Sequence, residues 1–179
     1  MNICVFCSAN EQIDPDFFLV ASQLGVWAAN HGHAIVFGGH NAGLMRAVSK
    51  AAKEAGGRVI GVVPHRIEEM GHLSPYLDEH ITTNDLTDRK QIMLEQSDAF
   101  VVLPGGIGTL DELFTVVAAA TLGYHHKPVI LLNMKGFWSS LINCMDDLQQ
   151  KGVMRKSWQE YIKTATTLEE IVAVLESSL

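Results

Sequence analysis

The sequence has little positive charge. Its 179 residues include 13 lysines and arginines against 20 aspartates and glutamates, so the formal net charge is −7, and charged residues make up only 18% of the chain. Nucleic acids and anionic membranes attract broadly basic surfaces, so we expect neither as a partner. The hydrophobic fraction of 47% excludes a disordered chain. If the ligand is an anion, the positive charge that holds it must be local.

Long hydrophobic runs and paired cysteines are also missing. No run approaches the ~18 apolar residues of a membrane span, and the first residues lack the basic start and the length of a secretory signal. Three cysteines form no disulfide framework, which favours a reducing compartment. We therefore expect a cytoplasmic protein without a membrane segment.

Neither the cysteines nor the histidines form a metal motif. Cys4 and Cys7 fall within an apolar strand pattern, where side chains three residues apart point to opposite faces, so we predict that both are buried structural residues. No second Cys-x-x-Cys follows, and the eight histidines lack the i,i+4 spacing of helical metal ligands. We predict no metal site.

Strand patterns alternate with helical patterns along the whole chain. The predicted strands are residues 2–7, 34–37, 58–64, 99–104, 128–133 and a short one near 161–164. The predicted helices are residues 16–31, 43–55, 88–96, 109–122, 137–150 and a last one with a capping box from Thr167 to Glu170. Residues 65–87 mix turn-forming residues with isolated apolar ones and are predicted to be irregular.

Most of these strands are continuous apolar runs, which is typical of parallel strands buried on both faces. Their alternation with helices is typical of the α/β class. No repeat, low-complexity segment or linker divides the sequence. We predict that residues 1–179 form a single doubly wound, Rossmann-like α/β domain with a mainly parallel sheet.

Ligands of doubly wound sheets bind at the carboxyl ends of the strands, beside helix N-termini. The turn at 104–109 is the most specific candidate there, because Gly105, Gly106 and Gly108 allow backbone amides to converge on a phosphate. Thr109 adds a hydroxyl donor at the start of the following helix. We predict that these four residues bind the phosphate of a substrate.

Two further turns, at 8–10 and 38–43, follow strands, and they contribute Ser8 and Gly39 to the predicted substrate-binding residues. Two standard nucleotide motifs do not fit. The dinucleotide fingerprint would need a glycine at position 111, which is an aspartate, and the Walker motif would need a lysine where Leu44 stands.

Charged residues flank the glycine turn. Asp111 and Glu112 lie one helical turn after it, where acids often complement the helix dipole. A carboxylate there would also stand beside a bound phosphorylated sugar and could position a water for attack at the anomeric carbon. Arg89 and Lys90 precede strand 99–104; we favour a binding role over a solvated surface pair, because positive charge is so scarce in this chain.

Several stretches occur in an order and at a spacing that resemble a known family. Among them are FCSAN (6–10), FGGHNAGLM (37–45), DRKQIM (88–93) and DAFVVLPGGIGTLDEL (98–113). The sequence resembles the cytokinin riboside 5′-monophosphate phosphoribohydrolases, the "Lonely guy" family, which is often mislabelled as lysine decarboxylases. The resemblance spans nearly the whole chain, and its core motif, Pro-Gly-Gly-x-Gly-Thr-x-x-Glu, is specific.

The resemblance implies hydrolysis of the N-glycosidic bond of a nucleoside 5′-monophosphate, AMP or a cytokinin-type nucleotide, to free base and ribose 5-phosphate. By motif match, Arg89 and Glu112 correspond to the catalytic pair and the glycine turn to the phosphate cradle, with Lys90 beside it. The resemblance also implies a homodimer, with the active site near the interface, and no cofactor.

The chain departs from the family pattern at His40 and Arg46, where glycines are usual, and at Ile107. These positions surround the expected base pocket, so the residues leave the preferred base open. The alternative function is a non-catalytic nucleotide or molybdenum-cofactor carrier of the same fold. A carrier would not require both Arg89 and Glu112, so their presence favours the enzyme.

Overall fold

A seven-stranded sheet, in which all neighbouring strands run parallel, forms the centre of the protein. The computed structural model describes residues 1–178 and orders the strands β4-β3-β2-β1-β5-β6-β7. The strands are β1 (Asn2–Phe6), β2 (Ala34–Phe37), β3 (Val59–Pro64), β4 (Glu79–Thr83), β5 (Ala99–Val102), β6 (Val129–Leu132) and β7 (Lys163–Ala165). This arrangement confirms the predicted α/β class and parallel sheet.

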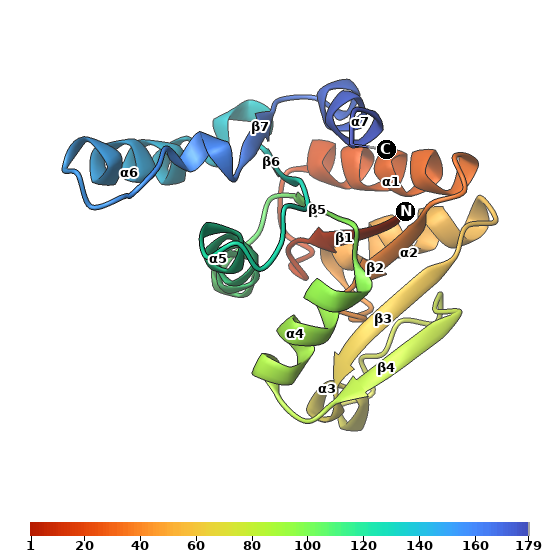
Figure 1. Ribbon diagram of the computed structural model, residues 1–179. Coiled ribbons are helices and arrows are strands. Elements are labelled where there is room, and N and C mark those ends of the chain that lie inside the picture. Colours follow the sequence, from red (N-terminus) through yellow and green to blue (C-terminus); the bar gives the residue numbers. More distant parts are fainter. Residues whose placement is uncertain (179) are drawn as a thin grey trace.

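Helices cover both faces of the sheet (Figure 1). The α-helices are α1 (Pro15–Asn30), α2 (Gly43–Glu54), α3 (His65–Glu69), α4 (Leu86–Gln96), α5 (Ile107–Thr121), α6 (Ser139–Gln150) and α7 (Leu168–Glu176), with 3₁₀ turns η1 (Met134–Gly136) and η2 (Trp158–Glu160). Helices α1, α2 and α7 pack on one face, and α4, α5 and α6 on the other. Within residues 1–178, no helix has the length and apolar character needed to cross a membrane.

The two faces of the sheet contribute to two separate apolar cores. Cys7 belongs to the core under α1, α2 and α7, whereas Cys4 belongs to the core under α4, α5 and α6, as side chains three residues apart on a strand must. Both thiols are buried and unpaired, and their burial raises the pKa of each well above the ordinary range. Both cysteines are therefore buried structural residues, as predicted.

The prediction that 65–87 is irregular is wrong at two places, because α3 and β4 both form there. Strand β4 has no apolar run: it is the sheet's exposed edge, and its Glu79 pairs with Arg58 at 2.6 Å. Backbone pairing to β3 thus creates a strand without the hydrophobic pattern of the inner strands. Helix α4 also begins earlier than predicted, since Asp85 accepts hydrogen bonds from the amides of Thr87 and Asp88.

The strand order reverses at β1, which lies between β2 and β5, so the turns after these three strands meet at one edge. Backbone hydrogen bonds connect these turns through one residue. The N–H of Ser8 donates to the carbonyl of Pro104 at 3.0 Å, and the carbonyl of Ser8 accepts from the N–H of Leu44 at 2.9 Å. These hydrogen bonds hold the three turns together at the carboxyl edge of the sheet.

Candidate active site

An arginine–glutamate pair is enclosed at this carboxyl edge. Arg89 comes from the first turns of α4 and Glu112 from the first turns of α5, and Nη1 of Arg89 lies 2.8 Å from Oε1 of Glu112. Only 11% of the Arg89 side chain and 4% of the Glu112 side chain are exposed. Because breaking such a buried pair leaves a charge without compensation, the two residues are electrostatically dependent on each other.

Two backbone features fix the guanidinium of Arg89. Its Nε donates to the carbonyl of Val62, at the end of β3, at 3.1 Å. Its Nη2 lies against Gly38, where an added Cβ would come within 2.1 Å of it. An arginine has five N–H donors, so donors remain for a substrate after these contacts. Gly38 was part of a candidate turn, but sequence reasoning did not identify its contact with Arg89.

Burial raises the pKa of the Glu112 carboxyl above its ordinary value of 4.5, and the adjacent Arg89 charge opposes this shift. Desolvation is the larger effect, since the carboxyl has lost most of its contact with water. A buried carboxyl with a raised pKa, held next to a cation, is suited to accept a proton.

The glycine turn after β5 carries four predicted residues and leads into α5, which bears Glu112. Gly105 packs under Thr109, whose Oγ1 would lie 2.0 Å from an added Cβ, so glycine is required there for the chain's own packing. Gly106 and Gly108 have no atom within 4 Å of an added Cβ and face open space. No side chain caps the N-terminus of α5. Its first amides are therefore available to an anion.

The N-terminus of α2, at the same edge, is already occupied. The carboxylate of Glu11 accepts a hydrogen bond from the N–H of Gly43 at 2.8 Å, and its second oxygen pairs with Arg46 at 2.8 Å. Sequence reasoning missed Glu11, because the contact joins residues 32 positions apart and no motif marks it. Of the two helix N-termini that follow β2 and β5, that of α5 is therefore the one available to an anion.

The remaining predicted residues, Lys90, Ser8 and Gly39, differ in their contacts. The Nζ of Lys90 is 2.7 Å from Asp111, which keeps its charge beside the start of α5. Ser8 uses its Oγ to accept the N–H of Asn10 at 3.0 Å, so only its hydroxyl proton is free to be donated. Gly39 has a φ of 73° and packs against Val63, so its role in the structure is to make the turn.

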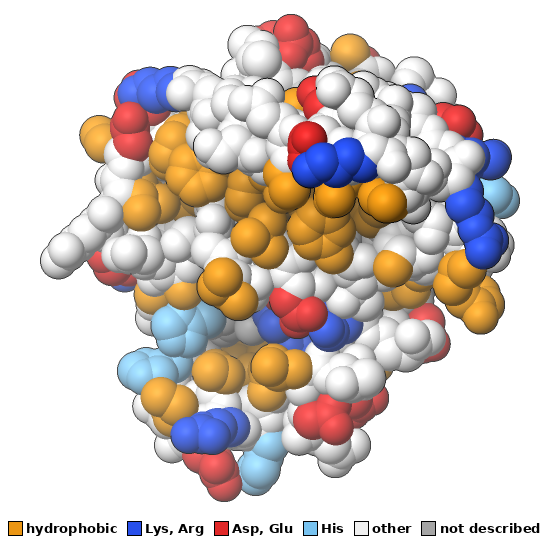
Figure 2. Space-filling model, turned by 90° about the vertical axis from the view of Figure 1, so that its left-hand side faces the viewer, with side chains coloured by type: hydrophobic (Ala, Val, Ile, Leu, Met, Phe, Trp, Pro, Cys, Tyr) orange, Lys and Arg blue, Asp and Glu red, His pale blue; other side chains and the backbone are white. Residues whose placement is uncertain are grey.

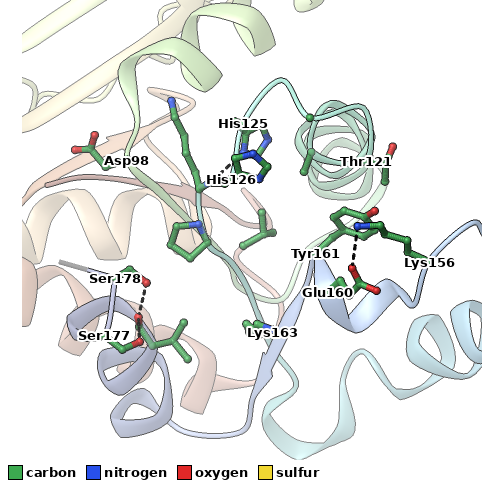
Figure 3. Close-up of a pocket in the computed structure, with 16 residues that line it drawn as sticks. Asp98, Thr121, His125, His126, Lys156, Glu160, Tyr161, Lys163, Ser177 and Ser178 are labelled. Carbon is green, nitrogen blue, oxygen red and sulfur yellow. Dashed lines mark hydrogen bonds and ion pairs between the residues drawn. The ribbon is translucent and has the colours of Figure 1, made fainter.

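A cleft of about 850 Å³ lies at the opposite, amino edge of the sheet (Figure 3). Helices α5 and α7 both end there, and helix C-termini carry partial negative charge that disfavours an anion. Its lysines are also engaged: Lys127 donates to the carbonyl of Leu94 at 2.7 Å, and Lys156 lies 3.4 Å from Glu160. We therefore place the candidate site at the buried pair and not in this cleft.

Among residues 1–178, no group of three or more His, Cys, Asp and Glu side chains is arranged to hold a metal ion. That the protein uses no metal stays a prediction.

Comparisons with known proteins place these features in context. Residues 45–175 match a family described as "Possible lysine decarboxylase". The chain is 38% identical to a probable cytokinin riboside 5′-monophosphate phosphoribohydrolase of Oryza sativa subsp. japonica, covering 97% of this chain and 82% of that protein. It is 37% identical to a cytokinin riboside 5′-monophosphate phosphoribohydrolase of Arabidopsis thaliana, covering 97% and 81%.

Among solved structures, a molybdenum cofactor binding protein from the phototrophic bacterium Rippkaea orientalis is similar over 98% of this chain and 95% of that chain. Its TM-score is 0.75 and its sequence identity 26%. The sequence relatives carry the names of enzymes, whereas this structural neighbour is a binding protein. Likeness in fold alone therefore does not separate the two functions, and the side chains at the site must decide.

Proposed function

Since the chain belongs to the cytokinin riboside 5′-monophosphate phosphoribohydrolase family, we propose that it hydrolyses the N-glycosidic bond of a nucleoside 5′-monophosphate. Water attacks the anomeric carbon, the bond to the base breaks, and the products are free base and ribose 5-phosphate. The observation that carries this proposal is the buried Arg89–Glu112 pair beside the open N-terminus of α5. AMP and cytokinin-type nucleotides are the proposed substrates.

Glu112 is the proposed base. Its carboxylate accepts a proton from the attacking water, and its negative charge stabilises the oxocarbenium-like ribosyl centre as the bond to the base lengthens. The burial that raises its pKa also strengthens its electrostatic effect on that centre, because little water screens it.

The charge of Arg89 favours the ionised form of Glu112 and opposes the raised pKa of the buried carboxyl, and its hydrogen bond holds the carboxylate in one orientation. Its anchoring to Val62 and against Gly38 fixes the guanidinium before substrate binds, so little is lost in ordering it during the reaction. The donors that Arg89 does not use within the chain face the substrate, where they bind the nucleotide or assist the departing base.

The phosphate binds at the start of α5. The amides after Gly106, the helix dipole and the hydroxyl of Thr109 supply donors, and Lys90 supplies a positive charge nearby. Gly106 and Gly108 face open space, so nothing within the chain explains why both lack side chains. Close approach of a phosphate would explain it.

A pyridoxal-phosphate decarboxylase does not fit these side chains. Such an enzyme needs a lysine free to form a Schiff base. Lys90, at the site, is paired with Asp111, and Lys127 donates to the end of α4 at the opposite edge of the sheet. We derive no step through that cofactor.

A homodimer is proposed as the active form. Large apolar side chains stay exposed on α5 and in the segment that follows it, and Figure 2 shows hydrophobic groups gathered across this face. The exposed fractions are 43% for Phe114, 69% for Leu122 and 78% for Tyr124. A second copy covering this face would bury them, next to the helix that carries Glu112. The unpaired cysteines support a reducing compartment, the cytoplasm.

Chromatography of base and ribose 5-phosphate tests the proposed function. We expect purified protein to release free base from AMP, and a panel of nucleoside 5′-monophosphates to rank the bases. The carrier alternative is favoured by the likeness to a molybdenum cofactor binding protein. Tight binding across the panel with no release of base would support that carrier and reject the hydrolase.

A further inference from the structure

A pair of histidines lies next to the turn whose Gly38 contacts Arg89, and the proposed chemistry has not used it. His40 follows the end of β2, and His72 lies in the segment between α3 and β4. Their ring centroids are 5.1 Å apart with the planes at 68°, so the edge of one ring meets the face of the other. Neither residue was among the predicted site residues.

Backbone hydrogen bonds fix the two segments to each other. The N–H of Asn41 donates to the carbonyl of His72 at 2.8 Å, and the N–H of Ser74 donates to the carbonyl of Gly39 at 2.8 Å. His40 itself forms an antiparallel bridge with the His72 segment. The imidazole of His40 is therefore held on a rigid support and not on a free loop.

The position of His40 follows from the strand order. The phosphate cradle lies after β5, β1 comes next, and the turn after β2 carries both Gly38, which contacts Arg89, and His40 two residues later. A nucleoside 5′-monophosphate carries phosphate, ribose and base in that order. With the phosphate at α5 and the ribose at the Arg89–Glu112 pair, the base extends toward His40.

The two ring nitrogens of His40 have different surroundings. Nδ1 is buried and has no hydrogen-bond partner among residues 1–178, whereas Nε2 is not enclosed in this way. Burial, together with the nearby His72, lowers the pKa of His40, so the ring is neutral near pH 7. Buried N–H groups without an acceptor are rarer than buried acceptors without a donor, so we assign the single proton to Nε2. The ring then presents one N–H donor outward.

We propose that His40 contacts the base of the substrate and donates its Nε2–H to a ring nitrogen of a purine. This inference rests on the proposed function. As the bond between base and ribose breaks, its electron pair moves onto the base, and a donor to a ring nitrogen stabilises that charge. His72 is a positioning residue, since it orients the His40 ring by edge-to-face packing.

Binding to the inactive Glu112→Gln protein tests the contact without turnover. In that background we compare His40 with His40→Phe, which keeps a ring against His72 but lacks the donor. The probes are AMP and its 1-, 3- and 7-deaza analogues, each lacking one ring nitrogen. We expect His40→Phe to weaken AMP binding by roughly 3- to 10-fold, the range for one hydrogen bond.

One of the deaza analogues should bind the protein that retains His40 as weakly as AMP binds the His40→Phe protein. His40→Phe should not weaken the binding of that analogue any further, because the donor on the enzyme and the acceptor on the substrate form one interaction. In the protein that retains Glu112, His40→Phe should lower kcat for AMP, whereas His40→Gln, which keeps an N–H donor, should lower it less. His126→Phe, at the exposed amino edge, is the matched control and should leave both binding and kcat unchanged.

Thermal unfolding separates a lost contact from a damaged fold. His40→Phe removes a buried nitrogen without a partner, so its midpoint should be unchanged or higher. The proposed role of His40 would be overturned if AMP bound equally well to the proteins with and without His40→Phe. It would also be overturned if His40→Phe weakened the binding of AMP and of every deaza analogue by the same factor. Base-selective binding without any release of base by the unsubstituted protein would reject the hydrolase and leave the His40 contact standing.

Discussion

The amino and carboxyl edges of the sheet differ in the helix ends that they present to a ligand. The amino edge holds a cleft of about 850 Å³ and several lysines, but helices α5 and α7 end there, and Lys127 and Lys156 are engaged by a helix carbonyl and a carboxylate. At the carboxyl edge, α5 begins without a cap, beside a buried ion pair.

This comparison indicates that the direction of the helices determines which edge of the sheet binds an anion in this acidic chain. All strands are parallel, so helices that return along the sheet begin at the carboxyl edge and end at the amino edge. Positive partial charge therefore accumulates at one edge only. At the amino edge, Lys127 donates to a carbonyl at the end of α4 and Lys156 pairs with Glu160. At the carboxyl edge, the uncapped start of α5 leaves backbone amides for a ligand, beside the Lys90–Asp111 pair.

The largest expected effect is that of Glu112→Gln, which tests whether the carboxyl edge carries the chemistry. Removing the base should lower kcat for AMP by about 10²- to 10⁴-fold. Glutamine has nearly the same shape, but it leaves the buried Arg89 guanidinium without its counter-ion, so we expect the free energy of unfolding to fall. Base release and chemical denaturation measure the two quantities. Full activity of this variant would move the chemistry away from this edge.

Arg89→Met tests the dependence of the two buried charges on each other. It leaves Glu112 buried without its partner, and we expect a loss of about 3–5 kcal/mol in the free energy of unfolding near pH 7. The double variant with Glu112→Gln removes the stranded charge and should regain most of that loss. Additive effects in denaturant titrations would contradict a direct coupling.

The pH dependence of stability and of turnover tests the role of the Glu112 carboxyl. The folded protein binds the Glu112 proton more tightly than the unfolded chain, because burial raises the pKa above 4.5. Its contribution to stability is present below pH 4.5 and is lost as the pH rises through the raised pKa. Turnover needs the carboxylate, so it should rise over that same window. Parallel changes of stability and turnover, measured by denaturation and base release, would contradict this assignment.

A glycine comparison distinguishes packing from ligand approach. Gly108→Ala places a methyl in open space within α5, so stability should rise by up to about 1 kcal/mol, while KM for AMP should increase because the methyl crowds the phosphate. Gly105→Ala, the matched variant, clashes with Thr109 and should lose stability instead. Unchanged KM in folded Gly108→Ala protein would remove the phosphate from this turn.

The inner sheet was predictable because its strands are buried on both faces and must be apolar. Edge strand β4 was not, since its pairing to β3 leaves side chains exposed and charged, as Glu79 shows. At the site, spacing identified Arg89 and Glu112 as candidates but could not show that α4 and α5 bring them to 2.8 Å. The Glu11 contact with α2 was hidden for the same reason, because only the packed turns bring those residues together.

The smallest expected effect is that of Lys127→Met at the amino edge, which tests the other half of the comparison. The Lys127 ammonium donates to the carbonyl of Leu94 in the last turn of α4, so its loss should cost about 0.3–1 kcal/mol of stability. We expect kcat and KM for AMP to stay within about twofold of the unsubstituted protein, since surface changes remote from a site are usually near neutral. Lys163→Met, which lines the same cleft, should behave alike in turnover. A tenfold loss of turnover in either variant would show that the amino-edge cleft binds substrate, and helix direction would then no longer suffice to locate the site.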